Sequence, residues 1–412
     1  MAAPRGPSPI VQGMPVRSSH ITSLLPFALA LMPLPAVIVA GAFASASIAV
    51  VILGGLWLAW VDRARLMLAG QLALLAATGV MALTYPGKPT EGVLFAATAL
   101  CALAWPRLLD HLSARTLTGA RVVFVASAVL LPVLLLVRAL YLHAEIIPPF
   151  SLAPDMLAKP TFLAMPLVPA AVLLLVRWRF CTPLAAAFTS FMAIMAVGSA
   201  SSTATLGFAL GAAAVLAAYR RPWAGFGVAA GVLLLPLALS LAVQIAGVTD
   251  WSQVWLRGSW IHRLDLWQRA LILFQQAPWT GHGFDTYAHI QGAVDMGTLT
   301  FEHVGRNHAH SAAMQLLAEG GAPALLALFG LLALLAFPPG RPRADRLREA
   351  ARLGTLAAAV TPPAIGLNLW SDFTTMLVMY PLLAFALFVP ARPDALSPGR
   401  GGTAPAPAAS PG

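Results

Sequence analysis

The histidines and tryptophans of this chain gather in one stretch, and imidazole is the side chain best suited to proton transfer near neutral pH. Six of the nine histidines and five of the eleven tryptophans lie between Gly247 and His310. Only 10% of the residues are charged, so this polar stretch predicts a functional segment. His308 and His310 end it, and residues two apart in an extended segment point to the same side. We expect acid–base chemistry at this pair; capping of the following helix is the structural alternative.

Arg263 offers a second chemistry, because a guanidinium presents several fixed donors that suit phosphate or diphosphate. It stands immediately ahead of residues 264–277, where helical spacing relates the apolar residues Leu264, Trp267, Leu271 and Phe274. We expect an amphipathic helix along the outer membrane interface, with Trp267 near the headgroups. The turn residues of 278–283 would end it. The alternatives are a helix that only caps a bundle and an arginine that reaches lipid headgroups.

Polar residues continue into the next apolar segment. Ser311, Gln315 and Glu319 recur every four residues and would share one face of a helix. Ionisable residues at membrane depth are costly and usually functional. Arg138, near the outer end of its span, and Asp372, in an expected outer turn 368–373, have the same two interpretations, functional or structural. Arg138 is the stronger functional candidate.

A metal site is not expected. A metal needs a third ligand and a fixed shell around the histidines, and the sequence offers no His-x-x-x-His pair or acidic cluster.

The elements that must position these residues are membrane helices. A content of 59% hydrophobic residues and a mean hydropathy of +0.80 fit a multispanning membrane protein. Apolar runs of roughly 18 or more residues indicate bilayer-spanning helices. We therefore predict an all-α, polytopic integral membrane protein with about twelve spans. They are 21–41, 43–61, 66–84, 91–106, 118–141, 161–177, 181–199, 204–219, 223–246, 311–336, 352–369 and 373–390.

Positive charge predicts the orientation of these spans. With the N-terminus inside, 18 of the 25 Lys and Arg residues fall on the inner side. The net charge of +10 then reflects topology and gives no case for nucleic acid binding. The predicted parts are a cytoplasmic tail 1–20, nine spans in 21–246, one large periplasmic loop 247–310, three spans in 311–390, and a disordered cytoplasmic tail 391–412.

Four motifs in this order resemble the core of the bacterial O-antigen ligase family, whose superfamily includes O-antigen polymerases and protein O-oligosaccharyltransferases. They are Arg263-x-x-x-Trp267, Pro278-x-x-Gly281-x-Gly283, Asn307-His308-x-His310-Ser311 and Gln315-x-Leu317-x-Glu319-x-Gly321. The ligases carry His followed by Asn, Ser or Gln, then nine residues and Gly-x-x-Gly. His310-Ser311 and Gly321 fit that count, whereas Ala324 replaces the last glycine. Relatives also have a Ser-Arg-Gly-like motif, but residues 199–205 contain no arginine.

The resemblance implies transfer of a glycan from a polyprenyl (undecaprenyl) diphosphate carrier to a sugar hydroxyl of the lipid A core. The reaction would take place on the periplasmic side of the bacterial inner membrane. His310 would be the general base, and Arg263 would stabilise the leaving diphosphate. Other expected substrate contacts are Trp267, His308, Gln315, Glu319, Arg138 and Arg257, the last two as replacements for the missing arginine.

The implied partners are the carrier-linked glycan, the lipid A core or another glycan acceptor, and membrane lipids. No cofactor is implied: the diphosphate already activates the donor, and the sequence has no P-loop. A polymerase or protein O-oligosaccharyltransferase would use the same donor with another acceptor. A transporter is a further alternative, but it would favour internal repeats and polar residues at the midplane, and the polar residues here gather at the outer end.

Overall fold

The computed structural model describes residues 20–34, 40–61, 97–98, 101–102, 104–105, 108–143, 155–178, 182–198, 201–248, 258–283, 286–287, 308–337, 345–367 and 372–390. Every regular element in these ranges is helical, which confirms the predicted all-α class. The helices are α1 (His20–Leu31), α2 (Ala40–Val61), α5 (Leu108–His111), α6 (Ala114–His143), α7 (Asp155–Arg177), α8 (Thr182–Gly198), α9 (Ser202–Arg220), α10 (Pro222–Ile245), α11 (Gly258–Gln276), α12 (Ala312–Ala336), α13 (Arg346–Ile365) and α14 (Asp372–Phe388).

Four helices in the described part of the chain are long and apolar enough to cross a membrane, judged by length and composition. They are α9, α10, α12 and residues Ala114–Val137 of α6. Large apolar side chains such as Leu216, Ile245 and Leu326 are exposed on them, which is typical of a surface that faces lipid. The predicted count of twelve is not confirmed. The predicted span 66–84 lies outside the described residues.

The predicted first span, 21–41, is wrong as a single helix. Helix α1 ends at Leu31, and α2 begins at Ala40. Pro33 follows the end of α1; a proline has no N–H to donate to the preceding turn, and it disfavours helical geometry at the residue before it. Hydropathy registers this segment as one apolar run because it does not account for the proline.

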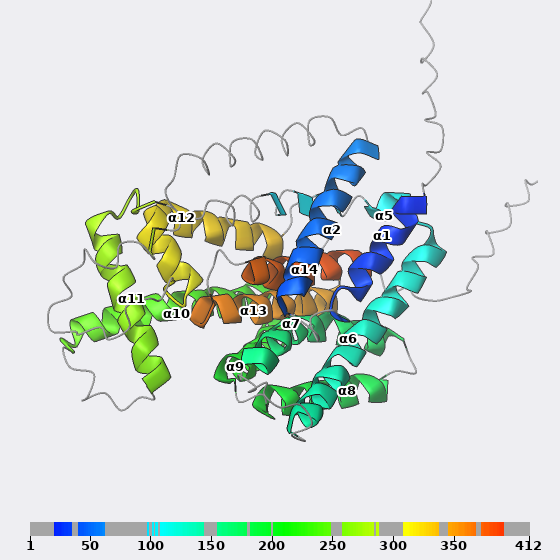
Figure 1. Cartoon of the computed structure of the whole chain (residues 1–412), viewed down its shortest axis with the longest axis horizontal. Coiled ribbons are helices and arrows are strands. Elements are labelled where there is room, and N and C mark those ends of the chain that lie inside the picture. The colour runs from blue at the N-terminus through cyan, green and yellow to red at the C-terminus, as the bar shows by residue number, and fades with distance from the viewer. Residues whose placement is uncertain are drawn as a thin grey trace, which may run out of the picture.

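Helix α13 lies at the centre of the molecule, with α11 and α12 at one end and α1, α2, α5 and α6 at the other (Figure 1). It packs most extensively against α9, and also against α10 and α7. Gly207 and Gly211 of α9 face α13, where a Cβ added at Gly211 would lie 3.0 Å from Cβ of Ala358 and 3.3 Å from the carbonyl oxygen of Gly354. Small residues at four-residue spacing let two helix backbones approach this closely.

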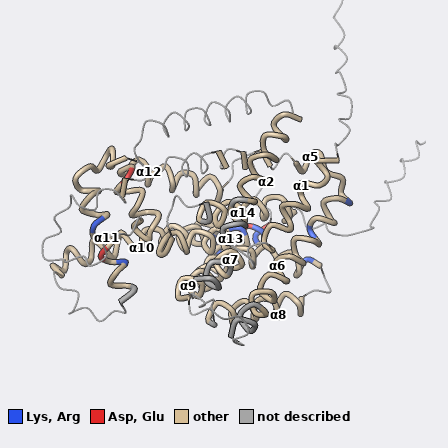
Figure 2. The backbone as a smooth tube through the Cα atoms, viewed as in Figure 1, with Lys and Arg blue, Asp and Glu red and all other residues tan. Residues whose placement is uncertain are grey.

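Charged residues of the described part of the chain include a group around α13 and a group on α11 and α12, with others near α6 (Figure 2). Around α13, arginines bind carbonyls at and just beyond the end of α14: Arg121 Nε donates to Phe388 O at 2.9 Å, Arg177 Nη1 to Pro390 O at 3.0 Å, and Arg348 Nε and Nη2 to Val389 O at 3.3 Å. The carbonyls at a helix carboxyl end lack intrahelical partners, so these arginines satisfy them.

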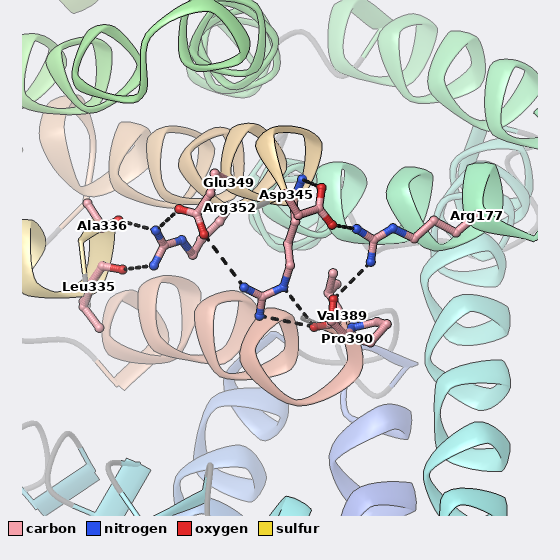
Figure 3. Close-up of polar contacts among 9 residues, drawn as sticks. Arg177, Leu335, Ala336, Asp345, Glu349, Arg352, Val389 and Pro390 are labelled. Atoms are coloured by element: carbon pink, nitrogen blue, oxygen red, sulfur yellow. Dashed lines mark hydrogen bonds and ion pairs between the residues drawn. The ribbon is translucent and has the colours of Figure 1, made fainter. Parts of the chain in front are cut away.

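Two acidic side chains complete this arginine cluster (Figure 3). Asp345 caps the amino end of α13 and pairs with Arg177, and Glu349 pairs with Arg352. Arg352 also donates to the carbonyls of Leu335, at 3.1 Å, and Ala336 at the end of α12. The cluster thus fixes the ends of α7, α12 and α14 to the first turns of α13.

Candidate functional site

His310 is held by a carbonyl at the opposite end of α13 from the arginine cluster. Its Nδ1 lies 3.0 Å from the carbonyl oxygen of Gly366, the residue that caps the carboxyl end of α13. Because a carbonyl oxygen can only accept, Nδ1 carries the proton in this contact, and the lone pair of the neutral ring is on Nε2. The contact therefore selects the tautomer that can take up a proton at Nε2.

The backbone at His310 corrects the extended geometry that was expected for this segment. Its φ is +51°, a left-handed conformation that costs a non-glycine residue roughly 1–2 kcal/mol. This bend directs the N–H of His310 to Nδ1 of His308 at 3.1 Å, and the two ring centroids lie 4.1 Å apart. The two imidazoles do lie together, and His308 supports the backbone that carries His310.

A third imidazole, His262 of α11, was not singled out from the sequence. Its ring centroid lies 5.9 Å from that of His310 in an edge-on arrangement. The available signal was its position next to Arg263 in the histidine-rich stretch. His282 is separate, since its Nε2 contacts the carbonyl of Leu273 at 2.9 Å. Among the described residues, no group of three or more His, Cys, Asp or Glu side chains could hold a metal ion.

The polar stripe on α12 is confirmed. Ser311 caps the helix by accepting from Met314 N at 3.4 Å, and Gln315 Nε2 donates to Glu319 Oε1 at 3.2 Å. Ser311, Gln315 and Glu319 are all buried. Glu319 Oε1 also accepts the backbone N–H of Tyr287 at 3.3 Å, a contact that the sequence did not predict. The stripe runs along α12 from Ser311, the residue that follows His310.

The amphipathic helix was predicted correctly, but two of its residues were placed wrongly. Helix α11 begins at Gly258, so Arg263 lies inside it, with its guanidinium 5.3 Å from the Trp260 ring centroid. Burial lowers the pKa of Arg263 from its ordinary value, although arginine keeps its charge in proteins. Trp267 is fully buried in an apolar cluster, because the apolar face of α11 packs on protein and not on headgroups. Its role as a substrate contact stays a prediction.

Helix α12 is kinked at Gly321, and this kink explains the motif Pro278-x-x-Gly281-x-Gly283. Gly321 has non-helical geometry inside α12 and Pro323 has no N–H, so carbonyls of the preceding turn lose their helical partners. His282 N donates to Ala318 O at 3.0 Å and Gly283 N to Glu319 O at 2.9 Å; in return Ala322 N donates to Pro278 O at 2.8 Å. We call these three bonds between residues 278–283 and 318–322 the loop zipper.

Glycine is required at the loop zipper. Gly281 has φ +62° and Gly321 has φ +65°, a conformation that L side chains rarely adopt. A Cβ at Gly281 would overlap the backbone of Glu319, and one at Gly321 would lie 2.6 Å from Pro278 O. The zipper joins the end of α11 to the turn of α12 that carries Glu319.

The remaining predicted residues are only partly located. Arg257 lies outside the described residues, and Arg138 and Asp372 lie in α6 and α14, where their side chains are not described. Asp372 is the first residue of α14, and residues 368–371 of the outer turn expected before it lie outside the described residues. Thr203, from the stretch that lacks an arginine, lies next to Gly366, since a Cβ at Gly366 would be 3.5 Å from Thr203 Oγ1. Thr203 thus lies beside Gly366, whose carbonyl orients His310.

Comparison with known proteins supports the resemblance noted in the sequence. A search of curated proteins found no match to the chain. The family model described as O-antigen ligase matches residues 185–329. The matched part runs from α8 into α12 and contains the three imidazoles, the polar stripe and the loop zipper. The resemblance is therefore confirmed over residues 185–329, which are similar to the O-antigen ligase family.

Proposed function

We propose that this protein transfers a glycan from undecaprenyl diphosphate to a sugar hydroxyl of the lipid A core, on the periplasmic side of the inner membrane. The contact between His310 Nδ1 and Gly366 O is the observation that carries the proposal. It fixes the tautomer that a general base needs, and this imidazole lies in the segment similar to O-antigen ligases.

In the proposed reaction, Nε2 of His310 accepts the proton of the acceptor hydroxyl. The acceptor oxygen forms a bond to the anomeric carbon of the glycan, and the bond from that carbon to the diphosphate oxygen breaks. The electron pair leaves with the diphosphate, whose charge Arg263 stabilises. A half-buried arginine suits this role because its field is less screened there than in water.

The test is transfer by purified protein supplied with carrier-linked glycan and lipid A core, with chelator present and without nucleotide. We expect transfer, and His310→Ala should slow it roughly 10²–10⁴-fold, the usual range for positioned proton transfer. His282→Gln is the matched control, because His282 lies in the same region. Its contact with Leu273 O requires only a hydrogen-bond donor, which the glutamine amide can supply. Unchanged activity in His310→Ala would remove His310 from the mechanism.

The acceptor is tested in the same assay by offering a second carrier-linked glycan, or a peptide, in place of lipid A core. Product on lipid A core supports the ligase reaction. Elongation on the carrier would instead identify a polymerase, and glycosylated peptide a protein O-oligosaccharyltransferase.

A further inference from the structure

An apolar groove lies between α7, α9 and the amino-terminal part of α13, with one residue of α8 in its wall. Its volume is about 360 Å³. It extends from Leu347 to Ala358 along α13, a length of about 16 Å at 1.5 Å per residue. Thr189 is the one polar side chain among the described residues that line it, and its hydroxyl already donates to Ala185 O at 2.8 Å. The groove therefore suits an elongated apolar occupant that needs no hydrogen bond.

The groove opens to the surroundings at one end. Three of its lining residues are exposed there, Val176 by 38%, Leu216 by 71% and Leu347 by 40%. We call this open end the mouth of the groove. Small residues of the facing helices, such as Gly211 and Ala351, leave the space behind the mouth. An apolar chain can therefore enter from the outer surface of the bundle.

The ends of three helices meet at the mouth. The last residue of α7 pairs with the residue that caps the amino end of α13. Helix α9 runs antiparallel to α13, since Gly207 lies against Thr361 and Val215 lies against Gly354. The carboxyl end of α9 is therefore beside the amino end of α13.

Exposed positive charge lies at the same ends. Arg220 is four residues beyond Leu216, one turn further along the same face of α9, and Arg346 is the first residue of α13. Both arginines are exposed and have no ion pair within the described residues. The acidic side chains in the first turn of α13 and at its cap, Glu349 and Asp345, pair with other arginines. The charge of Arg220 and Arg346 thus remains for an anion from outside the protein.

The mouth has the features of a membrane–water interface. Helix α9 is long and apolar enough to cross a membrane, and it ends with Tyr219, 55% exposed, and Arg220; aromatic and basic residues gather at such interfaces. Gly366, whose carbonyl holds His310, follows Leu347 by 19 residues. This separation is about 28 Å along a helix, close to the roughly 30 Å thickness of the hydrocarbon core. A headgroup at the mouth therefore belongs to the leaflet opposite the imidazoles, which excludes a donor held at His310.

We propose that the groove binds an anionic phospholipid, with one acyl chain between α7, α9 and α13 and the phosphate at Arg220 and Arg346. Basic pockets between membrane helices bind anionic headgroups, and a guanidinium gives a phosphate two parallel donors. The bound lipid would hold α7 and α9 against α13. This site is separate from the proposed reaction and does not depend on it.

The test titrates the full chain in detergent micelles with phosphatidylglycerol or phosphatidylcholine of the same acyl chains, and native mass spectrometry counts the bound lipid. The wild type should bind phosphatidylglycerol about 25-fold more tightly, since each arginine near a headgroup contributes about fivefold. Arg220→Gln and Arg346→Gln should each weaken its binding about fivefold. Arg115→Gln is the matched control, because it removes an exposed arginine of α6, a helix that does not line the groove; it should leave binding unchanged.

A second pair of variants tests the acyl-chain site. Ala212→Phe places a ring in the groove, since Ala212 lines it and is exposed. This should weaken phosphatidylglycerol binding about tenfold, the loss from excluding about two methylene groups. Ala213→Phe makes the same change at an exposed neighbour that does not line the groove, and it should leave binding unchanged. Phosphatidylglycerol should also raise the thermal midpoint of Ala213→Phe more than that of Ala212→Phe.

Equal affinity of the wild type for the two lipids would overturn the inference, as would equal effects of Ala212→Phe and Ala213→Phe. Unchanged affinity in both arginine variants would overturn it even if Ala212→Phe failed to fold. Undecaprenyl phosphate that displaces phosphatidylglycerol and binds more tightly would assign the groove to the carrier lipid. A dimer that Ala212→Phe dissociates would assign it to a second copy of the chain, and either assignment overturns the inference. Absence of glycan transfer by the wild type would count only against the proposed function.

Discussion

Gly281→Ala tests whether the loop zipper stabilises the fold. Two costs should add in this variant. An alanine at φ +62° costs roughly 1–2 kcal/mol in backbone strain. Its Cβ would overlap the backbone of Glu319, so the loop must move and lose its bonds to Ala318 O and Glu319 O, each worth about 0.5–1.5 kcal/mol. The expected loss of unfolding free energy is about 2–5 kcal/mol.

Gly247→Ala separates these two costs. Gly247 has φ +64°, close to that of Gly281, but no atom lies within 4 Å of the position its Cβ would take. The strain is matched and the steric overlap is absent, so this variant should lose only roughly 1–2 kcal/mol. The difference between the variants, about 1–3 kcal/mol, is the contribution of the two hydrogen bonds.

The assay is unfolding of the purified protein in mixed micelles, followed by circular dichroism as the denaturing detergent is increased. Transfer activity is measured in parallel, and it should fall further in Gly281→Ala than in Gly247→Ala because the zipper holds the turn that carries Glu319. Equal losses of stability in the two variants would refute the reasoning, since they would show that the zipper adds nothing beyond backbone strain.

Two further predictions concern the histidine pair and the topology. His308→Ala should reduce transfer, because His308 Nδ1 accepts the N–H of His310, but less than His310→Ala does at matched membrane levels; equal losses would leave the choice of general base between them open. Reporter fusions after Asp285 should register as periplasmic and those after Arg346 as cytoplasmic; a cytoplasmic signal at Asp285 would invert the predicted placement of the site.

The sequence predicted which segments form helices better than it predicted what those helices pack against. Apolar spacing over 264–277 located the core of α11, and four-residue spacing located the stripe of α12, because both depend on helical periodicity alone. Periodicity says which residues share a face but not what that face packs against. Trp267 was therefore placed at headgroups although it lies in the protein core.

Backbone atoms explain most of what was missed at the site. The acceptor that orients His310 is the carbonyl of Gly366, 56 residues further along the chain, and no side-chain pattern marks such a partner. The glycine motif was recognised but its purpose was not, because the carbonyls that it meets become available only when α12 kinks at Gly321.

The contact between His310 and Gly366 also has a consequence for biogenesis. A chain made from its N-terminus delivers α11, the histidines and α12 before α13 exists, so the imidazole lacks the carbonyl that selects its tautomer until the chain has passed Gly366. Gly207 and Gly211 of α9 likewise have no packing partner until α13 has been made. The arrival of α13 therefore supplies the packing partner of α9 and orients His310 in one step, and a nascent protein that stalls before that step lacks the contact that orients this imidazole.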